Sequence, residues 1–257
     1  MSQAATTPAD PSVRAVVRAD ALRTVVATAR SLVSECRLRL DSDGLLVAAT
    51  DPATVASVRA RLDTAGFEQY DASETTVGVN LARLADVLAL GDPDDLVSLT
   101  VDDSRGLLHV EHADLHYTLA LIDPDAIRAP PDPEKLDFEH AGGLTLDSRF
   151  LSRVVDASEM VSDHVTLELD DERFRSVADG DTDTAVLAHD AADAHEFDPG
   201  EASAIYSLSY LDEIVSVLPG APVSLALGDD LPVELDYEFD DGHGAAEFVL
   251  SPRLRRT

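Results

Sequence analysis

The stretch LIDPDAIRAPPDPEKLDF, residues 121–138, divides the sequence into two halves of similar length. It holds four prolines, five acids and the only lysine of the chain, Lys135. Proline cannot donate a ladder hydrogen bond and favours extended backbone, so this composition predicts a connector rather than a strand or helix. About 14 such residues span roughly 40 Å, enough to cross the outside of a domain. The stretch therefore predicts two domains joined at this point.

The same order of elements occurs on both sides of this connector. Helical periodicity begins near Asp20, Asn80, Asp147 and Ser209, about 60 to 67 residues apart, and each helix is followed by alternating, strand-like segments. One such unit cannot bury both faces of its sheet, so two units should pair their sheets and place the helices on one face. The fold class is then α+β, with a disordered extension at 1–12, a first domain at 13–122, the connector at 123–137, a second domain at 138–254 and a tail at 255–257.

The charge of the chain is extreme. Its 50 acids and 19 bases give a formal net charge of −31, although 45% of its residues are hydrophobic. Salt at molar concentration reduces the screening length to about 3 Å, which removes most self-repulsion between surface carboxylates. The acidity therefore indicates solvation in a high-salt cytoplasm rather than a basic partner. The chain contains no run of 18 apolar residues, so no membrane-spanning segment is predicted. Its single cysteine, Cys36, excludes an internal disulfide framework.

Candidate catalytic residues are few. His109, His112 and His116 have the spacing H-x2-H-x3-H, which suggests a metal-dependent enzyme as one hypothesis. Alternation along strands would place these histidines on different faces, which favours ordinary surface or edge histidines instead. Cys36 has no histidine near it in sequence and is interpreted as a packed thiol. We therefore expect no catalytic site, no metal and no cofactor.

The positions of the arginines indicate a binding surface. Arg23 and Arg30 share one flank of the first predicted helix, and the face opposite its apolar stripe carries no acid. In so acidic a chain this pattern indicates contact with the phosphate backbone of nucleic acid. Ordinary solvated helix faces remain the alternative, because Asp86 and Asp156 share such faces and the fourth helix has acids but no base. The candidate DNA-facing residues are Arg23, Arg30, Arg83, Arg149 and Arg153.

Six stretches carry a resemblance to a known family. They are ATDPATVASVRARL (49–62), VGVNLARLADVL (77–88), YTLALIDPDAIR (117–128), DASEMVSDHV (156–165), YSLSYLDEIV (206–215) and VLSPRL (249–254). In order and spacing they resemble the DNA sliding clamp of archaea and eukaryotes, proliferating cell nuclear antigen (PCNA). The resemblance covers residues 13–254, and the acidity resembles the haloarchaeal branch.

The resemblance implies a ring of three chains with helices lining the hole, through which duplex DNA passes. Such a ring is not an enzyme: it tethers DNA polymerase, clamp loader, flap endonuclease, ligase and other replication and repair proteins through a short peptide, the PIP box. A cytoplasmic protein associated with the nucleoid would follow. The alternative is a peptide-docking scaffold, or a subunit that closes a ring only as part of a heterotrimer.

The resemblance also implies two further sites. The connector borders a pocket for the partner peptide, and by position that pocket comprises Thr50, Val55, Ser57, Ala126, Ile127, Leu231, Pro232, Val249, Ser251 and Pro252. Subunits in the family join edge strand to edge strand. Here the interface residues would be Tyr117, Leu119, Leu121, Thr184, Val186 and Leu187.

Overall fold

The computed structural model describes residues 11–129 and 138–253. Residues 1–10 of the expected extension, 130–137 of the connector and the expected tail lie outside the described residues. Ser12, which the sequence analysis placed in the extension, is hydrogen-bonded: its N–H donates to Val101 O at 3.0 Å, and its carbonyl accepts from Ser73 N–H. None of the helices in these two ranges is long and apolar enough to cross a membrane.

Within the described residues, the first half of the chain contains two α-helices and nine strands. Its elements are β1 (Val13–Arg18), α1 (Ala19–Arg30), β2 (Glu35–Asp41), β3 (Gly44–Thr50), β4 (Ala56–Asp63), β5 (Phe67–Ala72), β6 (Thr75–Asn80), α2 (Leu81–Leu88), β7 (Leu96–Asp102), β8 (Leu107–His112) and β9 (Leu115–Ala120).

The second half repeats this order of elements. It contains β10 (Gly142–Asp147), α3 (Ser148–Glu159), β11 (His164–Leu169), β12 (Arg173–Asp179), β13 (Thr184–Asp190), β14 (Glu196–Asp198), β15 (Ala202–Ser207), α4 (Leu208–Val215), β16 (Pro222–Leu227), β17 (Val233–Phe239) and β18 (Gly244–Leu250). In this repeat β4 corresponds to β13, because each is the third strand after the first helix of its half. By the same reasoning β9 corresponds to β18.

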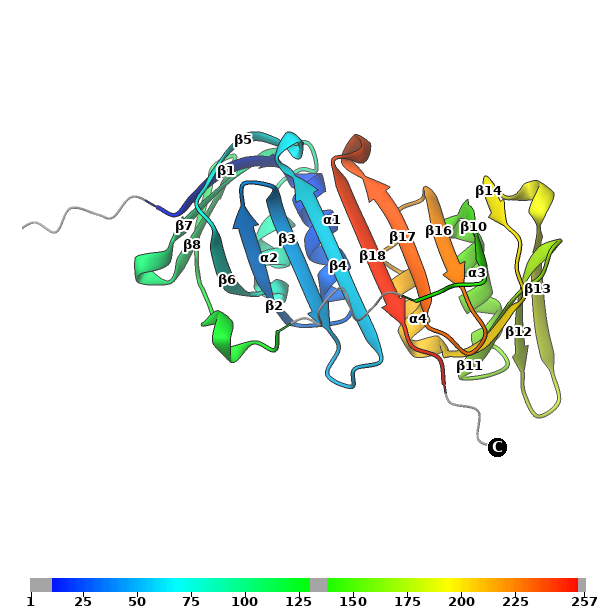
Figure 1. The fold of residues 1–257 in the computed structure, drawn as a ribbon. Helices are drawn as coiled ribbons and strands as arrows, with labels where there is room; N and C mark the ends of the chain where they lie inside the picture. The colour runs from blue at the N-terminus through cyan, green and yellow to red at the C-terminus, as the bar shows by residue number, and fades with distance from the viewer. Residues whose placement is uncertain (1–10, 130–137, 254–257) are drawn as a thin grey trace, which may run out of the picture.

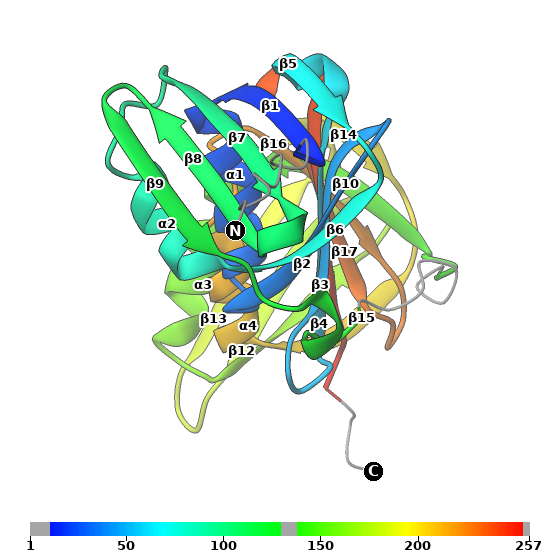
Figure 2. The ribbon, with the colours of Figure 1, turned by 90° about the vertical axis from the view of Figure 1, so that its left-hand side faces the viewer.

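Three antiparallel sheets organise the molecule (Figure 1). A nine-stranded sheet runs through both halves in the order β14-β10-β16-β17-β18-β4-β3-β2-β6. A five-stranded sheet, β5-β1-β7-β8-β9, lies at one end, and a four-stranded sheet, β13-β12-β11-β15, lies at the other. Figure 2 looks onto the five-stranded sheet, with α1 and α2 behind it. In both views the four helices lie on the same side of the nine-stranded sheet, as predicted.

The helix boundaries differ slightly from the sequence predictions. Asn80 and Asp147 do cap α2 and α3, because their side chains accept hydrogen bonds from Arg83 N–H and Arg149 N–H. Asp20, which was interpreted as the start and N-cap of the first helix, does not cap it: α1 already begins at Ala19, without a side-chain cap. Helix α4 begins at Leu208, one residue before the predicted Ser209.

Each unit begins with a strand that the sequence analysis missed. The strands β1, β6, β10 and β15 each lead directly into a helix without an intervening turn. Because the last residue of each strand occupies the N-cap of the following helix, no Gly or Pro marks the boundary between them. Alternation in such a short segment merges with the start of the helical pattern, which explains the omission.

The two domains are joined by more than the connector. Strand β18 pairs with β4 along its whole length, from Gly244↔Leu62 to Leu250↔Ala56. Behind this pairing, the Thr28 hydroxyl of α1 lies 2.5 Å from the Tyr237 hydroxyl of β17. Thr28 is fully buried and Tyr237 nearly so. The junction between the domains is therefore a continuous sheet with a buried polar contact beneath it.

Candidate functional site

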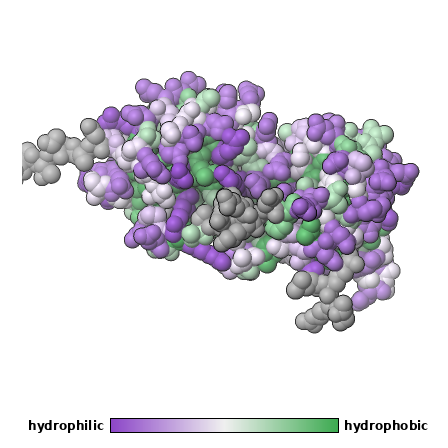
Figure 3. Space-filling view, viewed as in Figure 1, coloured by the Kyte–Doolittle hydropathy of each residue, from purple (hydrophilic) through white to green (hydrophobic). Residues whose placement is uncertain are grey.

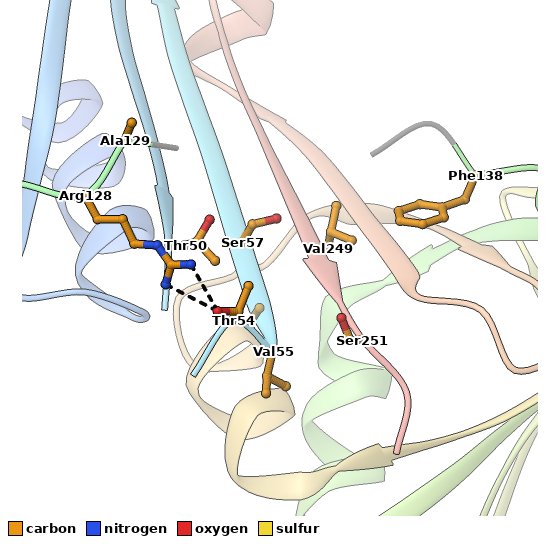
Figure 4. A pocket seen from close by; sticks show the side chains of 10 residues that line it. Thr50, Thr54, Val55, Ser57, Arg128, Ala129, Phe138, Val249 and Ser251 are labelled. Atoms are coloured by element: carbon orange, nitrogen blue, oxygen red, sulfur yellow. Dashed lines mark hydrogen bonds between the residues drawn. The ribbon is translucent and has the colours of Figure 1, made fainter. Parts of the chain in front are cut away.

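A cavity of about 170 Å³ opens on the outer face of the nine-stranded sheet, where the two domains meet (Figure 4). The turn between β3 and β4, the last strand β18 and the two described ends of the connector enclose it. Its lining residues are Thr50, Thr54, Val55, Ala56, Ser57, Arg128, Ala129, Phe138, Val249 and Ser251. On the same face, Figure 3 shows green hydrophobic patches on both sides of the grey atoms within a mostly purple surface. The cavity therefore offers apolar contacts in an otherwise hydrophilic surrounding.

Half of the predicted pocket residues line this cavity. Strand pairing explains why, since Thr50 pairs with Ser57 and Ser57 pairs with Val249, so three strands present one row of side chains. The residues brought together are Thr50, Val55, Ser57, Val249 and Ser251. Sequence reasoning missed Thr54, Ala56, Arg128, Ala129 and Phe138. The first four are within two residues of positions it had chosen, whereas Phe138 lies at the far end of the connector and had no chosen neighbour in sequence.

The structure does not bring the other predicted pocket residues into the lining, which are Ala126, Ile127, Leu231, Pro232 and Pro252. The Ile127 side chain packs instead against β6, where a methyl group added to Gly78 would lie 2.7 Å from Ile127 Cδ1. The Ile127 carbonyl is held from the other side by the guanidinium of Arg37, at 2.6 Å from Nη2. Glycine at position 78 thus allows the connector to lie close against the sheet.

The main chain of Leu231 and Pro232 is also engaged elsewhere. The Leu231 carbonyl accepts a hydrogen bond from the Tyr206 hydroxyl at 2.8 Å. The Pro232 carbonyl lies 2.9 Å from Nε2 of His140, at the start of the second domain. Tyr206 and His140 therefore fix the main chain of these two residues, and neither residue belongs to the cavity lining.

Asp51 shapes the turn that forms one wall of the cavity. Its carboxylate accepts hydrogen bonds from Ala53 N–H, Val55 N–H and Ala56 N–H at 2.6 to 2.8 Å, and from the Tyr210 hydroxyl of α4 at 2.8 Å. Burial alone would raise the pKa of Asp51, but these four donors outweigh it and hold that pKa below its usual value. The same contact raises the pKa of Tyr210 to about 12. Asp51 thus links the pocket wall of the first domain to a helix of the second.

The candidate DNA-facing arginines all lie on the helices, but their side chains are engaged differently. Arg30, Arg83 and Arg153 are exposed, and the Arg153 guanidinium lies 5.8 Å from the centroid of the Phe150 ring. Arg149 is also exposed and forms a two-point ion pair with Asp147, with Nη2 2.6 Å from Oδ2. Its charge is therefore partly neutralised within the chain.

Arg23 has a structural role that the sequence did not indicate. Its guanidinium donates to the Leu88 carbonyl, at 3.0 Å from Nε, and to the Gly91 carbonyl, at 2.7 Å from Nη2. These carbonyls belong to the C-terminal end of α2, where a cation is favourable. Arg23 therefore ties α1 to α2, and its contact with DNA stays a prediction.

The predicted interface residues lie on or beside two edge strands. β9 pairs only with β8 and β13 pairs only with β12 within the described residues, so each has a free edge. Tyr117 on β9 is 38% exposed and Val186 on β13 is 50% exposed, both high for large apolar side chains. Leu119 is 2% exposed and belongs to the core, so only its backbone is available to a partner. Thr184 is exposed, and Leu121 and Leu187 are half-buried.

The three histidines of the H-x2-H-x3-H pattern do not converge. Nδ1 of His109 lies 3.0 Å from the Thr118 hydroxyl, and Nε2 of His112 is buried 3.1 Å from the Val87 carbonyl. His116 pairs with Glu111. In the part of the chain that the structure describes, no group of three or more His, Cys, Asp or Glu side chains has the geometry to hold a metal ion. Cys36 is buried, in agreement with a packed thiol.

Comparisons with known proteins agree with this architecture. Residues 14–123 match the family model described as the N-terminal domain of proliferating cell nuclear antigen. The chain is 39% identical over 244 residues to the DNA polymerase sliding clamp of Haloarcula marismortui, covering 94% of this chain and 98% of the relative. The sliding clamp of Natronomonas pharaonis is also 39% identical, with the same coverage.

A solved structure extends the similarity to the whole fold. It is A. fulgidus PCNA with the C-terminal region of FEN-1 bound, which superposes with a TM-score of 0.89 at 33% identity, covering 95% of this chain and 100% of that one. Identity of this extent over nearly the full length, together with the repeated helix-and-sheet units, assigns the family. The chain belongs to the PCNA family of DNA polymerase sliding clamps.

Proposed function

We propose that three copies of this chain close into a ring around duplex DNA and tether replication and repair enzymes through peptides bound in the cavity. The free edges of β9 and β13 carry this proposal. Within one chain, β18 of the second domain pairs with β4 of the first. In the repeat these strands correspond to β9 and β13, so β9 of one copy and β13 of the next can form the same junction.

The helices, which would line the hole of the ring, suit a ring that slides. Their arginines are sparse, and α4 presents only acids and serines. If about four phosphates were neutralised, affinity would fall roughly 10³- to 10⁴-fold for each tenfold rise in salt, so contact alone would hold DNA poorly in molar salt. A closed ring retains DNA by topology, which makes strong contacts unnecessary.

The cavity suits the anchoring peptide of a partner. It lies beside the connector, has an apolar part formed by Val55, Val249 and Phe138, and carries Arg128 at its rim. The related A. fulgidus PCNA was solved with the C-terminal region of FEN-1 bound. We assign PIP-box peptides of DNA polymerase, clamp loader, flap endonuclease and ligase to this cavity. We assign the chain no catalytic activity and no cofactor.

Mass in solution tests the ring. Light scattering of the purified chain in about 3 M KCl, where carboxylate repulsion is screened, should give three times 27.4 kDa. A mass of 27.4 kDa for the chain alone would instead support the alternative of a docking scaffold or a heterotrimer subunit.

Val249→Asp should weaken PIP-box binding about 10-fold or more, because a charge at this nearly buried position would be desolvated against the peptide. Peptide titration by fluorescence anisotropy at high salt measures the affinity. Ala245 is half-buried and lies on the same face of β18 as Val249 but outside the cavity lining, so Ala245→Asp serves as the matched control. Equal affinity of Val249→Asp and the control would contradict the placement of the peptide.

A further inference from the structure

A second depression lies on the outer face of the first domain, beside the cavity. Leu46 on β3 pairs with Arg39 on β2 and with Arg61 on β4. One row nearer the cavity, Ala48 pairs with Arg37 on β2 and with Arg59 on β4. We call this surface the arginine trough: its floor is Leu46 and Ala48, and its walls are Arg37, Arg39, Arg59 and Arg61. A volume of about 430 Å³ opens over its far end, where Arg39, Arg59 and Arg61 line it together with Asp41, Asp43 and Asp63.

The arginine trough is continuous with the cavity. The next row along the same strands is formed by Thr50 and Ser57, which line the cavity. Alternate residues of a strand face the same side and are about 7 Å apart. The first pair of trough arginines therefore lies about 7 Å from the cavity, and the second pair about 14 Å from it. An extended segment that leaves the cavity along β3 would pass between both pairs.

The arginines nearest the cavity have no carboxylate partner in the part of the chain that the structure describes. No hydrogen bond or ion pair engages Arg59 within the described residues, although Glu247 is its neighbour in the strand register. Among the described residues, Arg37 donates to the Ile127 carbonyl, and Arg128 donates to the Thr54 hydroxyl at 3.3 Å. Farther away, Arg39 pairs with Asp41 and Arg61 pairs with Asp63. In a chain with 50 acids and 19 bases, three clustered arginines that pair with no carboxylate of residues 11–129 or 138–253 form an unusual positive site.

We propose that the arginine trough binds an acidic segment of the partner peptide whose anchoring motif occupies the cavity; the inference rests on the proposed peptide-binding function. Guanidinium groups pair with carboxylates through two parallel hydrogen bonds. At molar salt only contacts of about 3 Å remain unscreened, so direct pairs of this kind persist where longer-range attraction does not. The apolar floor of Leu46 and Ala48 suits peptide side chains better than a phosphate backbone. The preferred partner is therefore a PIP-box protein with acids flanking its motif.

Matched peptides test this proposal on the full-length chain at about 2 M KCl, where only contact pairs survive. One peptide carries the PIP-box motif alone, and others carry a Glu-rich or a Gln-rich extension at either end. At one of the two ends, we expect the Glu-rich extension to bind about 5-fold tighter than the Gln-rich extension at the same end. This difference is equivalent to one or two exposed ion pairs. Arg59→Gln should abolish this advantage and leave the affinity of the motif alone unchanged. Arg105→Gln, on the turn between β7 and β8, is the control.

The outcomes separate this inference from the function on which it rests. Failure of the motif alone to bind would overturn the peptide function of the cavity. Binding of the motif with no gain from either Glu-rich extension, or a gain that persists in Arg59→Gln, would overturn only the arginine trough. A third outcome is that a short single-stranded oligonucleotide competes with the peptide in an Arg59-dependent manner, while the Glu-rich extensions give no gain in affinity. That result would assign the trough to phosphates and would also overturn the proposal.

Discussion

Val186→Asp is expected to convert the assembly from three chains to one, so that light scattering at high salt gives 27.4 kDa instead of three times that mass. Val186 is 50% exposed on the free edge strand β13 and would be covered by β9 of the next chain. A carboxylate there would lose its hydration without gaining a partner, at a cost of several kcal/mol for each of the three interfaces. Tyr117→Asp, on the opposing edge, should have the same effect.

Met160→Asp provides the control for this experiment. Met160 is a large apolar side chain that is 85% exposed, but it lies at the end of α3 and on neither edge strand. The control introduces the same charge and should keep the full mass. A full-size assembly in both Val186→Asp and Tyr117→Asp would show that β9 and β13 do not join the subunits.

Asp51→Ala is expected to lower the free energy of unfolding by about 3 kcal/mol, since it leaves several buried donors without an acceptor. Asp51 is 2% exposed and accepts from three main-chain N–H groups of its own turn and from Tyr210 of the other domain. Denaturant unfolding at constant high salt measures the loss. Asp43→Ala, in the exposed turn between β2 and β3, should change stability by less than about 0.5 kcal/mol.

The pH dependence of this effect follows from the lowered pKa of Asp51. A carboxyl group whose pKa is lower in the folded protein stabilises the fold above its ordinary pKa of about 3.9, and this stabilisation is lost as the pH falls through the folded value. The difference in stability between the native chain and Asp51→Ala should therefore be greatest near neutral pH and shrink below about pH 4. A difference that stays constant from neutral to acid pH would mean that the ionised carboxylate is not what the four donors stabilise.

The sequence predicted the repeat and the side of the sheet on which the helices lie because those features depend on periodicity. Asn80 and Asp147 were also predictable, since an amide or carboxylate before an apolar helix is a local signal. Arg23 was not: its partners, the carbonyls of Leu88 and Gly91, are more than 60 residues away. No local pattern distinguishes an arginine that caps a neighbouring helix from one that faces solvent.

The pocket shows the same division. Positions on paired strands, such as Thr50 and Ser57, could be placed because register carries one to the next. Ile127 could not, since its orientation depends on close contact between the connector and Gly78. The arginine trough also escaped the sequence analysis, because its four arginines alternate with apolar residues in two separate strands and look like the ordinary polar face of each.

The pairing of β18 with β4 has a consequence for how this chain can evolve. Seven paired positions and the Asp51–Tyr210 contact hold the two domains together at the junction itself. The covalent link between the domains then contributes little to their relative placement. Substitutions at Thr54, Arg128 or Phe138, which line the proposed peptide cavity but lie outside the β18–β4 pairing, can therefore alter partner preference without altering the shape of the molecule, whereas Ser57 and Val249 serve both the cavity and the junction.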